Sequence, residues 1–148
     1  MSDRSGDCEA IRAVIADYAY ACDEARLGDW RATFLDDGSL EVNGDLYRGP
    51  DLDLLMEARV AIKQRDRAEG RGTRHHLTSQ RITPTAADSA EAWTYFQLVR
   101  AGAIEEAGVY RDRLRRIDGD WKFAHRAVTV EFRSAAAPNV ERPRPTHG

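Results

Sequence analysis

The hydrophobic pattern of the chain changes from helical to strand-like near its midpoint, and this change restricts the possible folds more than any other feature. Over the segment 8–25, apolar residues recur at the spacing of one helical face. They are Ile11, Val14, Ile15, Tyr18 and Cys22. The second half instead contains β-rich segments at 73–83, 91–100, 107–117 and 121–132. Helices followed by an antiparallel meander are typical of an α+β domain.

The first half predicts helices interrupted by a small hairpin. Residues 1–7 are expected to be a flexible start, with Asp7 as the N-cap of the first helix. A short second helix follows, capped by Asp29. The acidic residues and glycine at 36–38 indicate a turn before a hairpin at 39–48.

A third helix begins at Pro50, and the charged stretch 63–71 is equally compatible with a loop and with the solvated end of this helix. Its inner stripe consists of Leu52, Leu55, Met56 and Val60. Residues 84–90 and 118–120 join strands as hairpins, and residues 101–106 form a longer turn.

We therefore expect a cone-shaped α+β barrel, with about three N-terminal helices packed on a curved, mostly antiparallel sheet. This domain covers residues 8–133. It is followed at 134–148 by a proline-containing segment without periodicity, which predicts a flexible tail.

The composition excludes several classes of protein. A chain of 148 residues is the size of one domain, and a net charge of −3 gives no reason to expect a nucleic-acid partner. No apolar run approaches the ~20 residues of a membrane span, and the polar start is not a signal peptide, so we expect a cytoplasmic protein. Cys8 and Cys22, on one helix, would lie about 21 Å apart and could not form a disulfide.

A curved sheet with helices on one side encloses a pocket, and polar residues that break the apolar pattern there are candidates for chemistry. Asp23 lies beside the apolar stripe of the first helix; the competing interpretation is a surface acid near a helix end. His75 and His76 point to opposite faces of a strand, and His75 shares its parity with the apolar Leu77. An imidazole paired with a carboxylate is an efficient general base, although a structural histidine would fit the same pattern.

The last hairpin supplies a cation among apolar neighbours. Arg126 shares its face with Ala124 and Val128, so it needs either a substrate anion or a carboxylate such as Asp112. The aromatic candidates for contacts with a substrate are Tyr18, Tyr47, Trp93 and Tyr110. We predict no metal site, because no close pair of ligands shares a helical face and adjacent strand histidines diverge.

Several of these segments together resemble the SnoaL-like branch of the nuclear transport factor 2-like superfamily, which contains scytalone dehydratase and hexachlorocyclohexane dehydrochlorinase. The matching segments are 15–23, 28–30, 47–50, 74–79 and the hairpin 110–126. The resemblance implies a helix-1 aspartate and a strand histidine that remove a proton from carbon without a metal or organic cofactor. Carried over, these residues are Asp23 and His75, and a last-strand cation corresponds to Arg126. Tyr18 stands where the dehydrochlorinase has a lysine, which favours oxygen-bearing substrates over halide elimination.

We thus expect a cofactor-free lyase, isomerase or cyclase that acts on a small hydrophobic, oxygenated molecule of the polyketide-like or aromatic kind. One alternative is a non-catalytic ligand-binding or assembly module, like the small subunits of aromatic-ring dioxygenases. Another is an epoxide hydrolase or epoxide-opening cyclase, for which only Asp23, Arg126 and Asp112 are available. A homodimer that pairs through the outer sheet face is also expected.

Overall fold

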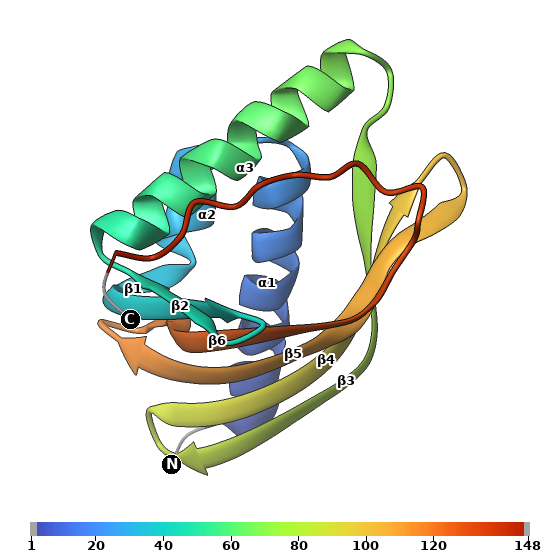
Figure 1. Cartoon of the computed structure of the whole chain (residues 1–148). Coiled ribbons are helices and arrows are strands. Elements are labelled where there is room, and N and C mark those ends of the chain that lie inside the picture. The colour runs from blue at the N-terminus through green and yellow to red at the C-terminus, as the bar shows by residue number, and fades with distance from the viewer. Residues whose placement is uncertain (1–2, 147–148) are drawn as a thin grey trace.

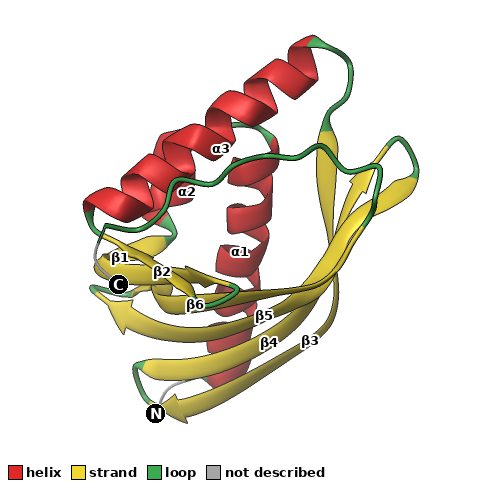
Figure 2. Cartoon of the chain, in the orientation of Figure 1, coloured by secondary structure: helices red, strands yellow, loops and turns green. Residues whose placement is uncertain are grey.

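The β-rich second half forms the continuous antiparallel part of one curved sheet, as the computed structural model of the chain shows (Figure 1). The structure describes residues 3–146. Within them, the helices are α1 (Arg4–Asp23), α2 (Leu27–Ala32) and α3 (Pro50–Ala68). The strands are β1 (Phe34–Val42), β2 (Asp45–Arg48), β3 (Thr73–Ala86), β4 (Ser89–Arg100), β5 (Ala103–Ile117) and β6 (Asp120–Arg133). The α+β class and the helices-on-sheet architecture are as predicted (Figure 2).

Within residues 3–146 the sheet has six strands in the order β2-β1-β6-β5-β4-β3, and β1 runs parallel to β6 while the other pairs are antiparallel. The turn expected at 36–38 is instead an irregularity within β1, where the register shifts between Phe34 and Ser39. Gly38 makes this close approach possible, because a Cβ there would lie 2.9 Å from the carbonyl oxygens of Leu35 and Phe123.

Two-residue turns join the later strands, which are therefore longer than predicted. Ala101 and Gly102 both have positive φ, 50° and 79°, so the longer turn expected at 101–106 is wrong and β5 begins at Ala103. Asp118 and Gly119 repeat this conformation between β5 and β6, as expected for a hairpin.

Helix α1 begins four residues before the predicted start at Cys8. Asp3 is its N-cap and accepts the backbone N–H of Ser5 at 3.0 Å. Asp7 lies inside the helix, and its carboxylate accepts hydrogen bonds from Arg116 at 2.7 Å and Trp121 at 3.2 Å. Residues 1 and 2 of the expected flexible start lie outside the described residues. Helix α2 likewise begins before Asp29, with Arg26 in the N-cap position.

Helix α3 continues through most of the charged stretch, so the helical interpretation of this stretch is correct as far as Ala68. It is not simply solvated, because Lys63 and Asp66 are buried. The hydrophobic core fills the space between the helices and the inner face of the sheet, with Ile15, Trp30 and Leu55 fully covered.

The segment 134–146 contains neither helix nor strand, as expected, but it runs alongside α3 and back towards the start of that helix (Figure 1). The Tyr47 hydroxyl donates to the carbonyl of Pro143 at 2.9 Å, and the Thr146 hydroxyl donates to Asp51 at 2.9 Å. The last two residues of the expected tail lie outside the described residues. No helix in residues 3–146 has the length and apolar character needed to cross a membrane.

Candidate active site

A cavity of about 400 Å³ lies between the inner face of the sheet, α1, α3 and the C-terminal segment. Its apolar wall includes Val42, Leu55, Phe96, Leu98, Val128 and Val130. The polar groups that reach it from the helices and from β3 include Tyr18, Arg59, Lys63, Thr73 and His75. A pocket in which an apolar wall meets converging polar groups is the usual setting of a small-molecule site.

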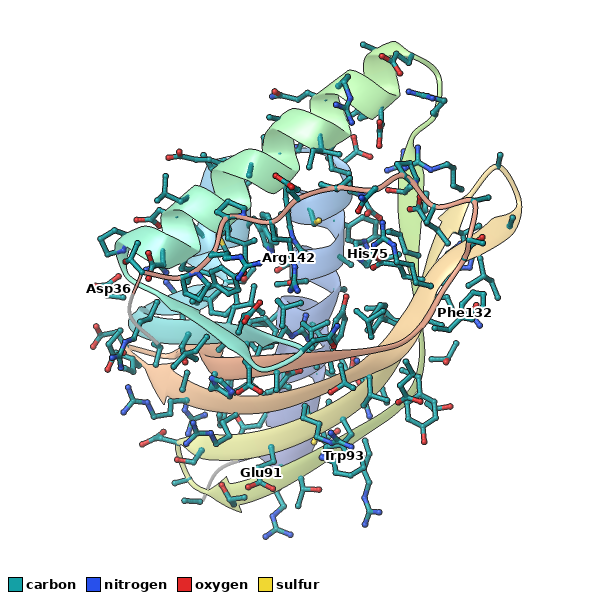
Figure 3. The ribbon with its side chains drawn as sticks, in the orientation of Figure 1. Asp36, His75, Glu91, Trp93, Phe132 and Arg142 are labelled. Carbon is teal, nitrogen blue, oxygen red and sulfur yellow. The ribbon has the colours of Figure 1, made fainter. Side chains whose placement is uncertain are left out.

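Asp23 and His75 meet at this cavity from different elements. Asp23 is the last residue of α1 and His75 lies near the start of β3, which runs beside that helix. The ring Nδ1 of His75 lies 2.6 Å from Oδ1 of Asp23, and the His75 backbone N–H donates to Oδ2 at 2.9 Å. His75 lines the cavity, whereas Asp23 lies behind it and is 5% exposed. Figure 3 shows His75 on the side of the sheet that carries the helices.

The sequence left open which of the two adjacent histidines faces the pocket. The structure places His75 inward, and it leaves His76 exposed on the other face of β3. Alternation along the strand is the reason, as the parity with Leu77 indicated.

Lys63 completes a buried cluster that sequence reasoning missed. Its ammonium donates to Oδ1 of Asp23 at 3.1 Å and also to the hydroxyl of Thr73. The side chain is 11% exposed. The only sequence signal was the position of Lys63 one turn after Arg59 and two turns after Leu55 on the inner stripe of α3.

The electrostatics of the cluster favour an ionised aspartate and a neutral histidine. Burial raises the pKa of Asp23, but the hydrogen bond from His75 and the nearby charges of His75 and Lys63 outweigh it, so the pKa falls below its ordinary value. Burial lowers the pKa of His75, and its contacts with Asp23 only partly oppose this effect. Because an ionised carboxylate only accepts, Nδ1 carries the proton of the neutral ring and Nε2 keeps its lone pair.

Two tyrosines from the predicted set line the cavity, and both rings stack against Arg126. The Arg126 guanidinium lies 4.2 Å from the ring centre of Tyr18 and 4.0 Å from that of Tyr110. Burial raises the pKa of both phenols, and the positive charge of Arg126 opposes this rise. Among residues 3–146, neither hydroxyl forms a hydrogen bond, so both can donate to a ligand.

Arg126 itself does not reach the cavity, so its predicted contact with a substrate is wrong. Its side chain is fully buried and donates two hydrogen bonds to Asp112, at 2.7 and 2.8 Å. Asp112 is equally covered, so neither residue lines the cavity. The pairing with a carboxylate, which the sequence left as the other possibility, is the one the structure contains.

Two other predicted contact residues also lie elsewhere. Trp93 is 49% exposed on the outer face of the sheet, with Arg111 over its ring at 4.7 Å. Figure 3 shows it far from His75. The buried residues of β4 are Ala90, Ala92, Thr94 and Phe96, so strand alternation turns Trp93 outward. Tyr47 is buried beside the cavity, where its hydroxyl holds the C-terminal segment instead of lining the wall.

Cys22, Asp23 and His75 are the group within residues 3–146 that could hold a metal ion, with ligand atoms within 4.8 Å of one another. The Lys63 ammonium, 3.1 Å from the same Asp23 oxygen, would be repelled by a cation bound there. Burial also raises the pKa of the Cys22 thiol, which disfavours the thiolate that a metal requires. The donor set therefore fits a metal poorly.

A second, wider depression of about 700 Å³ lies on the outer side of α1 and α2. Its lining among residues 3–146 includes Tyr20, Asp17 and Trp121 but no histidine. It lacks a buried acid–base pair, so we place the chemistry in the smaller cavity.

Comparison with known proteins places the chain in a family. The sequence profile described as a SnoaL-like domain matches residues 3–127. No curated protein matches the chain in sequence. Many solved structures do match.

One similar structure is a Mycobacterium tuberculosis protein of unknown function, with 25% identity and a TM-score of 0.73 over 87% of this chain and 74% of that one. A protein provisionally assigned as a scytalone dehydratase, from Novosphingobium aromaticivorans, has 22% identity and a TM-score of 0.68, covering 96% and 94% of the two chains. A hexachlorocyclohexane dehydrochlorinase from Novosphingobium barchaimii has 20% identity and a TM-score of 0.69, covering 95% and 98%. At these identities the last two show a shared fold.

Proposed function

The chain belongs to the SnoaL-like domain family, and from that premise we propose that it is a cofactor-independent lyase, isomerase or cyclase. Its substrate is a small hydrophobic, oxygenated molecule, and His75 is the general base. The observation that carries this proposal is the 2.6 Å contact between His75 Nδ1 and Asp23, beside a cavity of about 400 Å³ that has an apolar wall. This contact leaves Nε2 as the basic atom on the cavity side.

The proposed reaction begins when Nε2 of His75 removes a proton from a carbon next to a carbonyl group. The C–H electron pair moves into the substrate, and negative charge develops on the carbonyl oxygen. The hydroxyl groups of Tyr18 and Tyr110 line the cavity and can donate to that oxygen. Asp23 stabilises the imidazolium and holds its orientation.

The second half of the reaction depends on where the proton goes. In a dehydration, the C–O bond breaks and the imidazolium returns its proton to the departing hydroxyl, which leaves as water. In an isomerisation, the same proton returns to another carbon. Both outcomes restore neutral His75 and consume no external acid, base or reductant.

The epoxide-opening alternative is not supported by the positions of its residues. That chemistry requires Asp23, Arg126 and Asp112 around one water molecule. Arg126 and Asp112 are instead fully buried against each other and outside the cavity lining.

We also propose a homodimer formed through the outer sheet face. Trp93 and Tyr95 of β4 are 49% and 50% exposed there, which is unusual for large aromatic side chains. Light scattering of the purified chain tests this assembly. A monomer at micromolar concentration, or a dimer that persists after Trp93→Ser and Tyr95→Ser, contradicts it.

Proton exchange with heavy water tests the catalytic proposal before the substrate is known. A panel of aromatic and alicyclic ketones is incubated with the protein in D₂O, and deuterium at carbon is read by NMR. We expect exchange of at least one ketone with the wild type and none with His75→Ala. Equal rates for the two proteins, or no exchange by either, would instead favour a non-catalytic binding module.

A further inference from the structure

Six cationic side chains line the cavity, and five of them have acidic partners. The six are Arg59, Lys63, Arg65, Arg100, Arg133 and Arg142. The partners are Asp23 for Lys63, Asp66 for Arg65 and Arg100, Glu106 for Arg133, and Asp45 for Arg142. Arg59 is the exception: within the described part of the chain it has no ion pair and no hydrogen bond.

Arg59 belongs to the face of α3 that covers the cavity. Leu55 lies one turn before it and Lys63 one turn after it, and all three line the same space. The positive charge of Arg59 acts on the two tyrosines of the cavity: it opposes the rise that burial causes in the pKa of Tyr18 and Tyr110. It also contributes to the lowered pKa of His75.

Among the cations at the cavity, Arg59 is the one without an ion pair within residues 3–146; Glu141, an exposed acid of the same lining, also has none there. Lys63 compensates Asp23, and Asp112 compensates Arg126 behind the wall. A ligand that fills the apolar space displaces water from the unpaired guanidinium. With a neutral ligand, that lost hydration is not replaced, and burying an unpaired charge is costly. With an anionic ligand, it is replaced by a charge-assisted hydrogen bond.

We propose that Arg59 binds a carboxylate of the substrate, which makes the substrate a small hydrophobic carboxylic acid. The planar guanidinium can bind both carboxylate oxygens at once. One unpaired guanidinium matches one carboxylate, and Glu105, Glu106 and Glu141 in the same lining disfavour a dianion such as a phosphate monoester. This inference depends on the proposed function only in placing the substrate in this cavity.

Calorimetric binding of cinnamate and cinnamamide tests the proposal without turnover. The two compounds have nearly the same shape, and only the first carries a negative charge at pH 7.5. We expect the wild type to bind cinnamate about 10- to 100-fold more tightly than cinnamamide. Arg59→Gln should remove this preference and leave the affinity for cinnamamide nearly unchanged.

Arg67→Gln is the matched control, because it removes the same charge one helical turn beyond Lys63, outside the cavity lining. It should keep the preference for cinnamate. Equal affinity of the wild type for both compounds, no binding of cinnamate at millimolar concentration, or an unchanged preference in Arg59→Gln would each overturn the proposal. His75→Ala should keep the preference, so a failure of the proposed catalysis can be told apart from a failure of this inference.

Discussion

His75 and Asp23 are joined twice, once through the imidazole Nδ1 at 2.6 Å and once through the His75 backbone N–H at 2.9 Å. The two carboxylate oxygens therefore hold both the ring and the strand that carries it. This double attachment fixes the rotation of the imidazole, so that its second nitrogen is presented to the cavity without further rearrangement.

Replacing Asp23 by Asn should reduce turnover of the substrate about 10²- to 10⁴-fold with little change in fold. An amide keeps the size of the carboxylate, but it neither fixes the tautomer nor stabilises the imidazolium. Because Asp23 raises the pKa of His75 in the wild type, its loss should lower that pKa further. The measurement is kcat by steady-state kinetics together with NMR titration of His75. Full activity in this variant is incompatible with the proposed dyad.

Replacing Lys63 by Met should shift the pH dependence in the opposite direction. The positive charge of Lys63 lowers the pKa of His75, so its removal should move the acidic limb of kcat/KM to higher pH. Lys122→Met is the control, since Lys122 lies on β6 outside the cavity lining. If the acidic limb of the kcat/KM profile stays in place in Lys63→Met, or shifts equally in both variants, Lys63 does not lower the pKa of His75.

In the wild type, stability should begin to decline as the pH falls below about 6.5, and activity should decline at the lower pH where His75 titrates in the folded chain. The pKa of His75 is below its ordinary 6.5 in the folded chain, so between these two values the unfolded chain binds a proton that the folded chain does not. His75 thus contributes stability above pH 6.5 that is lost as the pH falls to the folded-state pKa. Chemical denaturation at several pH values in this range gives the free energy of unfolding of the wild type and of His75→Gln. This free energy should depend less steeply on pH in the variant. An identical pH dependence of the free energy of unfolding in the two proteins would contradict the lowered pKa of His75.

Replacing Arg126 is expected to affect mainly the stability of the fold. Arg126→Met leaves the Asp112 carboxylate buried without its partner and should lower the free energy of unfolding by about 3–5 kcal/mol. Adding Asp112→Leu removes that buried charge and should restore most of the loss. Urea denaturation of the two variants measures both effects. If the single variant is as stable as the wild type, the buried pair does not have the importance we assign to it.

The C-terminal segment should depend on Tyr47 for its position over the cavity. Tyr47→Phe removes the hydrogen bond to Pro143, and we expect the amides of residues 138–146 to exchange faster with heavy water. Tyr20→Phe is the control, because Tyr20 is 69% exposed on α1. Unchanged exchange in Tyr47→Phe would show that other contacts are sufficient to hold the segment.

The helices, the meander and the two dyad residues could be predicted because each depends on local periodicity. Asp23 and His75 interrupt an apolar pattern at positions whose side chains face inward, and alternation separates His75 from His76. Lys63 and Arg59 could not be predicted in this way. Charged side chains on a helix normally face solvent, and the packing of α3 over the cavity turns these two inward. The resemblance implies that Tyr18 stands where the dehydrochlorinase has a lysine. In this structure the ammonium beside Asp23 belongs to Lys63 of α3 instead.

The errors at the other candidates have equally specific causes. Trp93 was expected near the substrate because large aromatic residues are usually buried, but its parity on β4 places it outside. Arg126 was expected to meet either an anion or Asp112, and the register that pairs these two residues directly across β5 and β6 decides between them. Such long-range register cannot be read from periodicity within one strand.

The protonation state of His75 tests the proposed general base most directly, and its measurement requires no substrate. NMR of protein with ¹⁵N-labelled histidine at pH 7.5 distinguishes the two neutral tautomers from the imidazolium. The Asp23–His75 dyad predicts a neutral ring with the proton on Nδ1, and loss of this preference in Asp23→Asn. A proton on Nε2, or a doubly protonated ring at this pH, would show that His75 does not present a free base to the cavity.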